Sequence, residues 1–235
     1  MTSPLKKWNK FPPSIYLYML DCMFLVPIAD GITGNIVPRY LELQSWCDKN
    51  NSKILTCHRL FLNFARNYLA THGGGFAHPH PPKAKWLFWI DSDVDFTIEQ
   101  VEDLLSMPDE YRFCNGWYRS NFGDEAMCGY WDLDFFQEKH HMPFLSAKGL
   151  AEKAEKDPSH IVKVDWTGFG FTRLDSAVIE EMTYPYFTLN MNQLGDYRDM
   201  SFDDVSFCQN CKRETGVEPV VIPRLKVNHY KSFFV

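Results

Sequence analysis

The chain lacks an uninterrupted apolar stretch of membrane-spanning length, which takes about 20 residues. Its N-terminal apolar run is interrupted by Asp21, follows two consecutive prolines and ends without a small-residue cleavage site, so it is not typical of a signal peptide. Internal repeats and low-complexity tracts are also missing. We therefore expect no membrane span, and a cytoplasmic location or a place as a soluble domain of a longer protein.

A basic excess is missing as well, because 24 lysines and arginines stand against 30 aspartates and glutamates, a formal net charge of −6. Such a chain has no overall positive field, so nucleic acid is not an expected partner. A phosphate-bearing ligand would need local cations or a metal ion. Seven cysteines at irregular spacing do not make a disulfide framework, which favours a reducing compartment. Cys208 and Cys211 form a single CxxC, a weak signal for zinc or redox chemistry.

The first half of the chain contains short apolar runs that alternate with helical patterns. The expected strands are 22–29, 52–57, 85–90 and 111–118, and the expected helices are 35–50, 60–74 and 97–107. This alternation predicts an α/β fold with a mainly parallel central sheet flanked by helices.

The second half is less regular. It begins with an aromatic segment over 119–145 and continues with the expected helices 146–157 and 203–216. Strands are expected on both sides of a glycine turn in 161–174 and of a proline in 218–230. A length of 235 residues without a convincing linker predicts one domain.

The stretch "KWLFWIDSDVDF" carries an apolar strand directly into Asp91, Asp93 and Asp95. In a parallel α/β sheet, ligands bind beyond the carboxyl ends of the strands. Strand-like alternation places the three aspartates on one side, where their oxygens suit a hard divalent cation. The alternative is an acidic turn that stabilises the following helix through its dipole.

The order of motifs along the chain resembles that of glycosyltransferases of the GT-A fold. The matching motifs over about residues 22–230 are "VPIADG", "ARN", "WLFWIDSDVD", "DWTGFGF", "DDVSFC" and "VNHY". The run "ARNYLA" with "WLFWIDSDVD" is similar to the fungal mannan-polymerase mannosyltransferases. "DDVSFC" with "VIPRLKVNH" is similar to the family of cellulose- and hyaluronan-type synthases. The resemblance implies one GT-A (Rossmann-like) domain with a nucleotide-binding half at about 14–118 and an acceptor-binding half at about 119–235.

The resemblance also implies a binding site for a UDP- or GDP-sugar donor. Pro27 and Asp30 match the loop that holds the base and ribose, and Arg66 matches a helix arginine near the nucleotide. Arg66 has the alternative of pairing with a surface carboxylate.

For the metal, the resemblance implies Mn²⁺ or Mg²⁺ ligated directly by Asp93, with Asp91 towards the ribose or the metal's water shell. His229 matches the histidine that completes the metal site in many members of the family. His229 could instead be an ordinary histidine at a strand end, and Asp95 could only cap the next helix.

Asp203 and Asp204 stand at the start of an expected helix. An inverting transferase needs a base that removes the proton of the attacking acceptor hydroxyl. The family pattern gives this role to Asp204 and implies that Asp203 positions the acceptor. A helix N-cap is the alternative. The retaining mannan-type relatives leave the stereochemical outcome open, and the inverting one is favoured.

The turn "DWTGFGF" is the remaining candidate for the acceptor. Asp165 supplies a carboxylate, Trp166 a surface for an acceptor sugar, and Gly168 with Gly170 a backbone that a ligand can approach closely. An ordinary β-turn with a core tryptophan is the alternative.

These motifs predict a metal-dependent glycosyltransferase that acts on a glycan or glycoprotein acceptor. A sugar-phosphate nucleotidyltransferase is a second possibility, although "ADGITGN" lacks the basic residues of its phosphate loop. A non-catalytic carbohydrate-binding module is the third, supported only by the aromatic content of 16%. The oligomeric state is left open.

Overall fold

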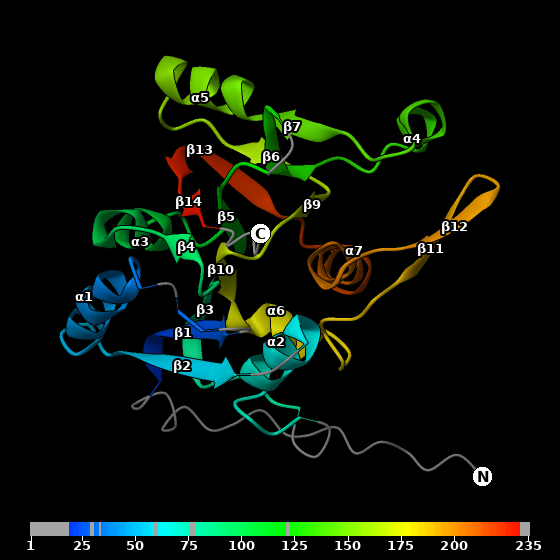
Figure 1. Ribbon diagram of the computed structural model, residues 1–235. Coiled ribbons are helices and arrows are strands. Elements are labelled where there is room, and N and C mark those ends of the chain that lie inside the picture. The colour runs from blue at the N-terminus through cyan, green and yellow to red at the C-terminus, as the bar shows by residue number, and fades with distance from the viewer. Residues whose placement is uncertain are drawn as a thin grey trace, which may run out of the picture.

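A seven-stranded sheet forms the centre of the computed structural model (Figure 1). The structure describes residues 19–28, 31–32, 34–58, 61–75, 79–120 and 123–230. In spatial order the strands are β2 (Ser52–His58), β1 (Leu20–Ile28), β3 (Ala84–Ile90), β10 (Phe171–Asp175), β5 (Phe113–Trp117), β13 (Val220–Lys226) and β8 (Val162–Lys163). Only β10 and β8 run against the direction of the other five strands. The predicted mainly parallel sheet is therefore confirmed.

Helices cover both faces of this sheet (Figure 1). α1 (Val37–Cys47) and α3 (Ile98–Leu105) pack on one face, and α2 (Leu62–Ala70), α6 (Ser176–Glu181) and α7 (Asp203–Thr215) pack on the other. Successive side chains of β3 alternate between the two cores, with Phe88 in the first and Trp89 in the second. A strand buried on both sides needs apolar residues at every position, which explains the unbroken run "WLFWI".

The ends of two helices follow the signals in the sequence. Thr97 accepts a hydrogen bond from the Gln100 backbone N–H while the Gln100 side chain accepts one from Thr97, so α3 begins with the expected capping box. α7 ends at Gly216, whose φ of 74° is easily adopted only by glycine.

One expectation about the last strands was wrong. Pro223 does not separate two strands but lies inside β13. The pairing of β13 with β5 is irregular between Val221 and Lys226, so no ladder hydrogen bond is required from the proline. The Pro223 carbonyl accepts a hydrogen bond from the Trp117 indole instead. Strand β14 (Asn228–His229) follows and pairs with β4 (Val94–Asp95).

The second half of the chain adds a smaller layer beside the sheet. A three-stranded sheet is made of β7 (Phe144–Ser146), β6 (Glu125–Gly129) and β9 (Trp166–Thr167), with helices α4 (Leu133–Lys139) and α5 (Ala147–Lys156). The hairpin of β11 (Met191–Leu194) and β12 (Tyr197–Met200) extends outward beyond α7 (Figure 1). The aromatic segment 119–145 thus contains β6, α4 and most of β7.

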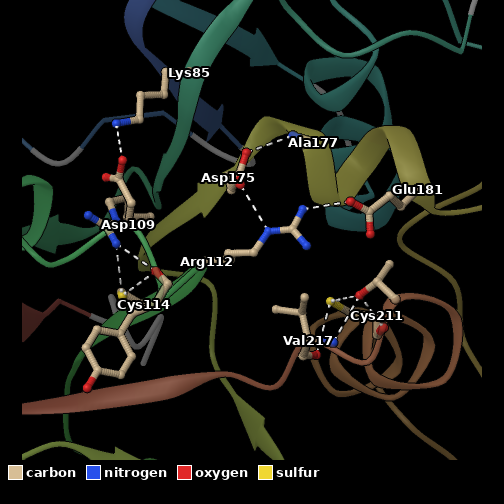
Figure 2. A network of polar contacts seen from close by, with 12 residues as sticks. Lys85, Asp109, Arg112, Cys114, Asp175, Ala177, Glu181, Cys211 and Val217 are labelled. Atoms are coloured by element: carbon tan, nitrogen blue, oxygen red, sulfur yellow. Dashed lines mark hydrogen bonds and ion pairs between the residues drawn. The ribbon is translucent and has the colours of Figure 1, made fainter.

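A polar network fixes the sheet at the end opposite to the aspartates of "DSDVD". Arg112 pairs with Asp175 at 3.0 Å and with Glu181 of α6 at 2.8 Å (Figure 2). Asp175 also caps α6 by accepting from the Ala177 backbone N–H. Asp175 lies opposite Trp86, near the beginning of β3. These contacts join β5, β10 and α6 away from the candidate site.

Candidate functional site

The carboxyl ends of β1 and β3 open into a cavity of about 680 Å³. Its volume is in the range of small-molecule sites. The predicted residues that line it are Pro27, Arg66, Asp91, Asp93, Trp166, Asp203, Asp204 and His229. They come from β1, α2, the β3–β4 connection, β9, α7 and β14, so the fold brings together residues from both halves of the chain. Asp30 lies outside the described residues.

Asp91, Asp93 and His229 form a group whose ligand atoms all lie within 4.8 Å of one another. The short β4–β14 ladder creates this group, because it sets His229 opposite Val94. The Tyr230 backbone N–H donates to the Asp93 carbonyl at 2.7 Å, and His229 Nε2 lies 3.0 Å from Asp93 Oδ1. Carboxylates suit both Mn²⁺ and Mg²⁺, and an imidazole nitrogen suits a transition metal better than Mg²⁺, so the residues fit the predicted ion and fit Mn²⁺ better.

The Tyr118 ring packs against the His229 ring and limits its movement. The two rings stack with centroids 4.6 Å apart and planes at 22°. A Cβ atom on Gly168 would lie 2.3 Å from the Tyr118 hydroxyl oxygen, and one on Gly170 would lie 2.8 Å from the same ring. Gly168 lines neither this cavity nor the second one described below. The glycines of "DWTGFGF" therefore make room for Tyr118, where the sequence suggested close approach to an acceptor.

The Arg66 guanidinium forms hydrogen bonds to two carboxylates, those of Asp91 and Asp203. Its Nη2 donates to both oxygens of Asp91 at 3.1 and 3.0 Å, and its Nη1 donates to Asp203 at 2.9 Å. The arginine is only 2% exposed, so its partners are not the surface carboxylates considered as an alternative. Burial alone would lower the pKa of Arg66, but the charges of Asp91 and Asp203 raise it overall. The guanidinium therefore stays charged and connects Asp91 to Asp203 at the start of α7.

Asp203 and Asp204 occupy the first turn of α7, after Phe202, whose side chain makes no capping bond. Asp204 lines the cavity, and its Oδ1 accepts from the Val205 backbone N–H at 2.8 Å. Burial raises the pKa of Asp204 to about 6, with Asp203 and Asp91 adding to the rise and Arg66 opposing it. A carboxyl with this pKa is mostly ionised at neutral pH and still basic enough to take up a proton, as a general base requires.

Trp166 and Asp165, which were predicted to bind the acceptor, do not line the same set of cavities. Trp166 is 5% exposed, and its indole N–H donates to the Tyr130 carbonyl at 3.1 Å, so only part of the ring reaches the cavity. Asp165 accepts from the Trp131 backbone N–H at 2.9 Å and from Lys212 at 3.1 Å. It lines a second cavity of about 620 Å³, not the first.

Two further findings concern Asp95 and the cysteines of the CxxC motif. Asp95 does not cap α3, since Thr97 does; Asp95 instead pairs with Arg39 at 3.1 Å. Cys208 and Cys211 are buried free thiols, and burial raises the pKa of both.

Sequence reasoning missed Tyr118 and Trp131, which line the first cavity. Trp131 follows β6 in the aromatic segment, where no periodicity marks one residue over another.

The chain matches no protein-family model and no curated protein. Solved structures resemble it in fold. A197 from STIV aligns with a TM-score of 0.55 and 14% identity over 91% of this chain and 87% of the other. GalNAc-T7, solved with UDP, GalNAc and Mn²⁺, aligns with a TM-score of 0.51 and 12% identity over 91% of this chain. The chain spans 44% of that GalNAc-T7 structure. At such identities the likeness shows the fold alone, which is GT-A-like.

In the described part of the chain, no helix has the length and apolar character to cross a membrane.

Proposed function

We propose that this chain is a metal-dependent glycosyltransferase that moves a sugar from a UDP- or GDP-sugar to a hydroxyl of a glycan or glycoprotein acceptor. One observation carries the proposal: a three-residue metal-binding group and a carboxyl with a raised pKa share one cavity at the carboxyl ends of the sheet. The likeness in fold to GalNAc-T7, a structure that holds UDP, GalNAc and Mn²⁺, supports it.

Asp93 and His229 would hold the divalent cation, with Asp91 towards its water shell or the ribose. When bound, the cation supplies positive charge that stabilises the leaving diphosphate. Pro27, which lines the same cavity, is assigned with Asp30 to the base and ribose. Both oxygens of Asp91 accept from Arg66, which fixes this carboxylate in its place. We therefore assign Arg66 to the donor side through Asp91, and not to direct contact with the nucleotide.

Asp204 is the proposed base of an inverting transfer. Its carboxylate would take the proton from the acceptor hydroxyl as that hydroxyl attacks the anomeric carbon. Asp203 faces Arg66 at 2.9 Å. We assign it to positioning the start of α7, and through it the acceptor, so that Asp204 stays in the cavity.

The two alternative functions, a sugar-phosphate nucleotidyltransferase and a carbohydrate-binding module, explain fewer of the residues in the first cavity. A nucleotidyltransferase would need a basic phosphate loop, and "ADGITGN" has no arginine or lysine. A carbohydrate-binding module would not need a metal-binding group beside a carboxyl whose pKa is about 6. The single domain over residues 1–235, its nucleotide-binding half at 14–118 and the cytoplasmic location stay predictions.

Thermal unfolding with UDP or GDP, in the presence and absence of Mn²⁺, tests the donor half of the proposal. At 100 times the dissociation constant, a ligand stabilises by about 2.7 kcal/mol, which corresponds to roughly 5–10 °C for a chain of this size. We expect that shift only when nucleotide and metal are both present. Asp93→Asn should remove it, and Asp95→Asn, two residues away in the Arg39 pair, should keep it. Stabilisation by neither nucleotide would contradict the proposal.

A further inference from the structure

The second cavity lies directly beside the first. The two share Trp131, Trp166 and Asn192 in their linings, so they meet at these side chains. Helix α7 runs along both, with Asp204 in the first cavity and Gln209 and Lys212 in the second. At 1.5 Å per residue, Gln209 and Lys212 lie about 8–12 Å along the helix from Asp204. A molecule that places a hydroxyl at Asp204 and reaches the second cavity must be longer than one sugar ring.

The second cavity is lined by side-chain amides held in fixed orientations. Asn190 Nδ2 donates to Gln209 Oε1 at 3.1 Å, and Gln209 Nε2 donates to Asn192 Oδ1 at 3.1 Å. Asn192 also donates to the Ser201 hydroxyl. Asn190 Nδ2 also donates to Asn210 and Asn192 Nδ2 to the Asn190 carbonyl, while Asn190 Oδ1 accepts from Thr188 and Gln209 Oε1 from Ser201. An amide has two N–H groups and two lone pairs, so one lone pair on Asn190, one on Asn192 and one N–H of Gln209 are left for a ligand. Preorganised donors and acceptors of this kind suit the hydroxyls of a sugar, and the half-buried indole of Trp131 supplies an apolar surface beside them.

The charges in the second cavity are already paired. Lys212 contacts Asp165 at 3.1 Å and Glu218 at 2.7 Å, and Arg213 contacts Glu214 at 2.8 Å. A phosphate or sulfate group would have to compete with these carboxylates for its cations. The cavity therefore suits a neutral ligand.

We propose that the second cavity is a subsite for a neutral sugar unit of the acceptor, one that lies beyond the unit receiving the transferred sugar. The acceptor is then an oligosaccharide chain, bound across both cavities along α7. This inference rests on the proposed glycosyltransferase function and adds the class of acceptor to it.

The experiment first identifies the donor by its metal-dependent hydrolysis, which needs no acceptor. Neutral oligomers of glucose, mannose, galactose and N-acetylglucosamine, one to four units long, are then compared as acceptors and titrated directly for binding. We expect KM to fall roughly 10-fold or more once the acceptor reaches the second cavity, because two or more hydrogen bonds are added. The value of kcat should change less than about 2-fold.

Three variants locate the effect. Gln209→Leu removes the central amide, and Met191→Trp adds bulk at a residue that lines the second cavity and is 64% exposed, so both should abolish the dependence of KM on acceptor length. Gln193→Leu is the matched control, because it removes an amide from the β11–β12 hairpin, which also carries Met191, at a position that lines neither cavity. It should keep the length dependence.

The outcomes separate the two proposals. Absence of donor hydrolysis and of nucleotide binding contradicts the proposed function itself. Donor hydrolysis with equal KM for all acceptor lengths overturns the subsite, as does failure of every neutral oligomer to bind. A peptide acceptor whose KM rises in Gln209→Leu would show a peptide groove and overturn the assignment to sugar.

Discussion

Removal of the Arg66 guanidinium should destabilise the protein strongly, because it would leave two buried carboxylates without a counter-charge. The Arg66 side chain is 3% exposed, and those of Asp91 and Asp203 are 14% and 10% exposed. Breaking a buried charge pair by removing one partner costs about 3–5 kcal/mol. For a chain of this size, Arg66→Met should then lower the Tm by roughly 6–20 °C.

Arg39→Met is the matched control. Arg39 also contacts two carboxylates, Asp95 at 3.1 Å and Glu42 at 3.4 Å, but its side chain is 36% exposed. Pairs that water can reach contribute about 0–1 kcal/mol, so this variant should unfold close to the wild type. The comparison therefore separates the effect of burial from the loss of an arginine.

Urea titrations at pH 7, without added metal, give the free energies of unfolding. Adding Asp203→Asn to Arg66→Met should recover part of the loss at pH 7 by removing one unpaired charge. If Arg66→Met costs no more than Arg39→Met, or if Asp203→Asn recovers none of the loss, the ion pairs of Arg66 with Asp91 and Asp203 do not stabilise the fold as argued.

Two further predictions concern Asp204 and the glycine turn. Because the folded state raises the pKa of Asp204 from 3.8 to about 6, it holds this proton more tightly than the unfolded chain. The ionised carboxylate thus lowers stability above pH 6 and has no such effect below pH 3.8. Asp204→Asn should raise the free energy of unfolding by up to about 3 kcal/mol at pH 7 and abolish transfer, and wild-type transfer should decline as the pH falls through 6. A variant less stable than the wild type at pH 7 would contradict the first expectation. Gly168→Ala should cost about 1–3 kcal/mol and weaken Mn²⁺-dependent nucleotide binding, since its Cβ would lie 2.3 Å from the Tyr118 hydroxyl oxygen. Gly149→Ala in α5, where the nearest atom is 3.5 Å away, should stabilise by up to about 1 kcal/mol in the same unfolding assay. Equal effects of the two substitutions would refute the packing argument.

The alternation of strands and helices could be predicted because it depends on local patterns. A strand buried on both faces, such as β3, is continuously apolar, and α3 carries its own capping box in Thr97 and Gln100. The position of the aspartates beyond β3 follows from the same rule, since a charged run after a buried strand must leave the core.

The partners of the site residues could not be predicted in this way. Arg66 contacts residues 25 and 137 positions away, and nothing in the local sequence indicates that both carboxylates meet one guanidinium. The pairing of β14 with β4 needs only two residues from each strand, too few for a pattern, yet it brings His229 to Asp93. Trp131 and the second cavity depend on how α7, β9 and the β11–β12 hairpin pack together, which is tertiary information.

The charges around the first cavity explain why the proposed donor needs a cation. Asp91, Asp93, Asp203 and Asp204 line it, and among the lining residues that the structure describes Arg66 is the only lysine or arginine. Arg66 already pairs with Asp91 and Asp203 through its two terminal nitrogens, so two carboxylates share its charge before a diphosphate enters; its Nε is buried without a hydrogen-bond partner. A diphosphate entering this cavity alone would meet an excess of negative charge that burial makes more costly. In the proposed site the balancing charge is that of a cation held by Asp93 and His229, so we expect nucleotide binding to require the metal and not merely to be improved by it.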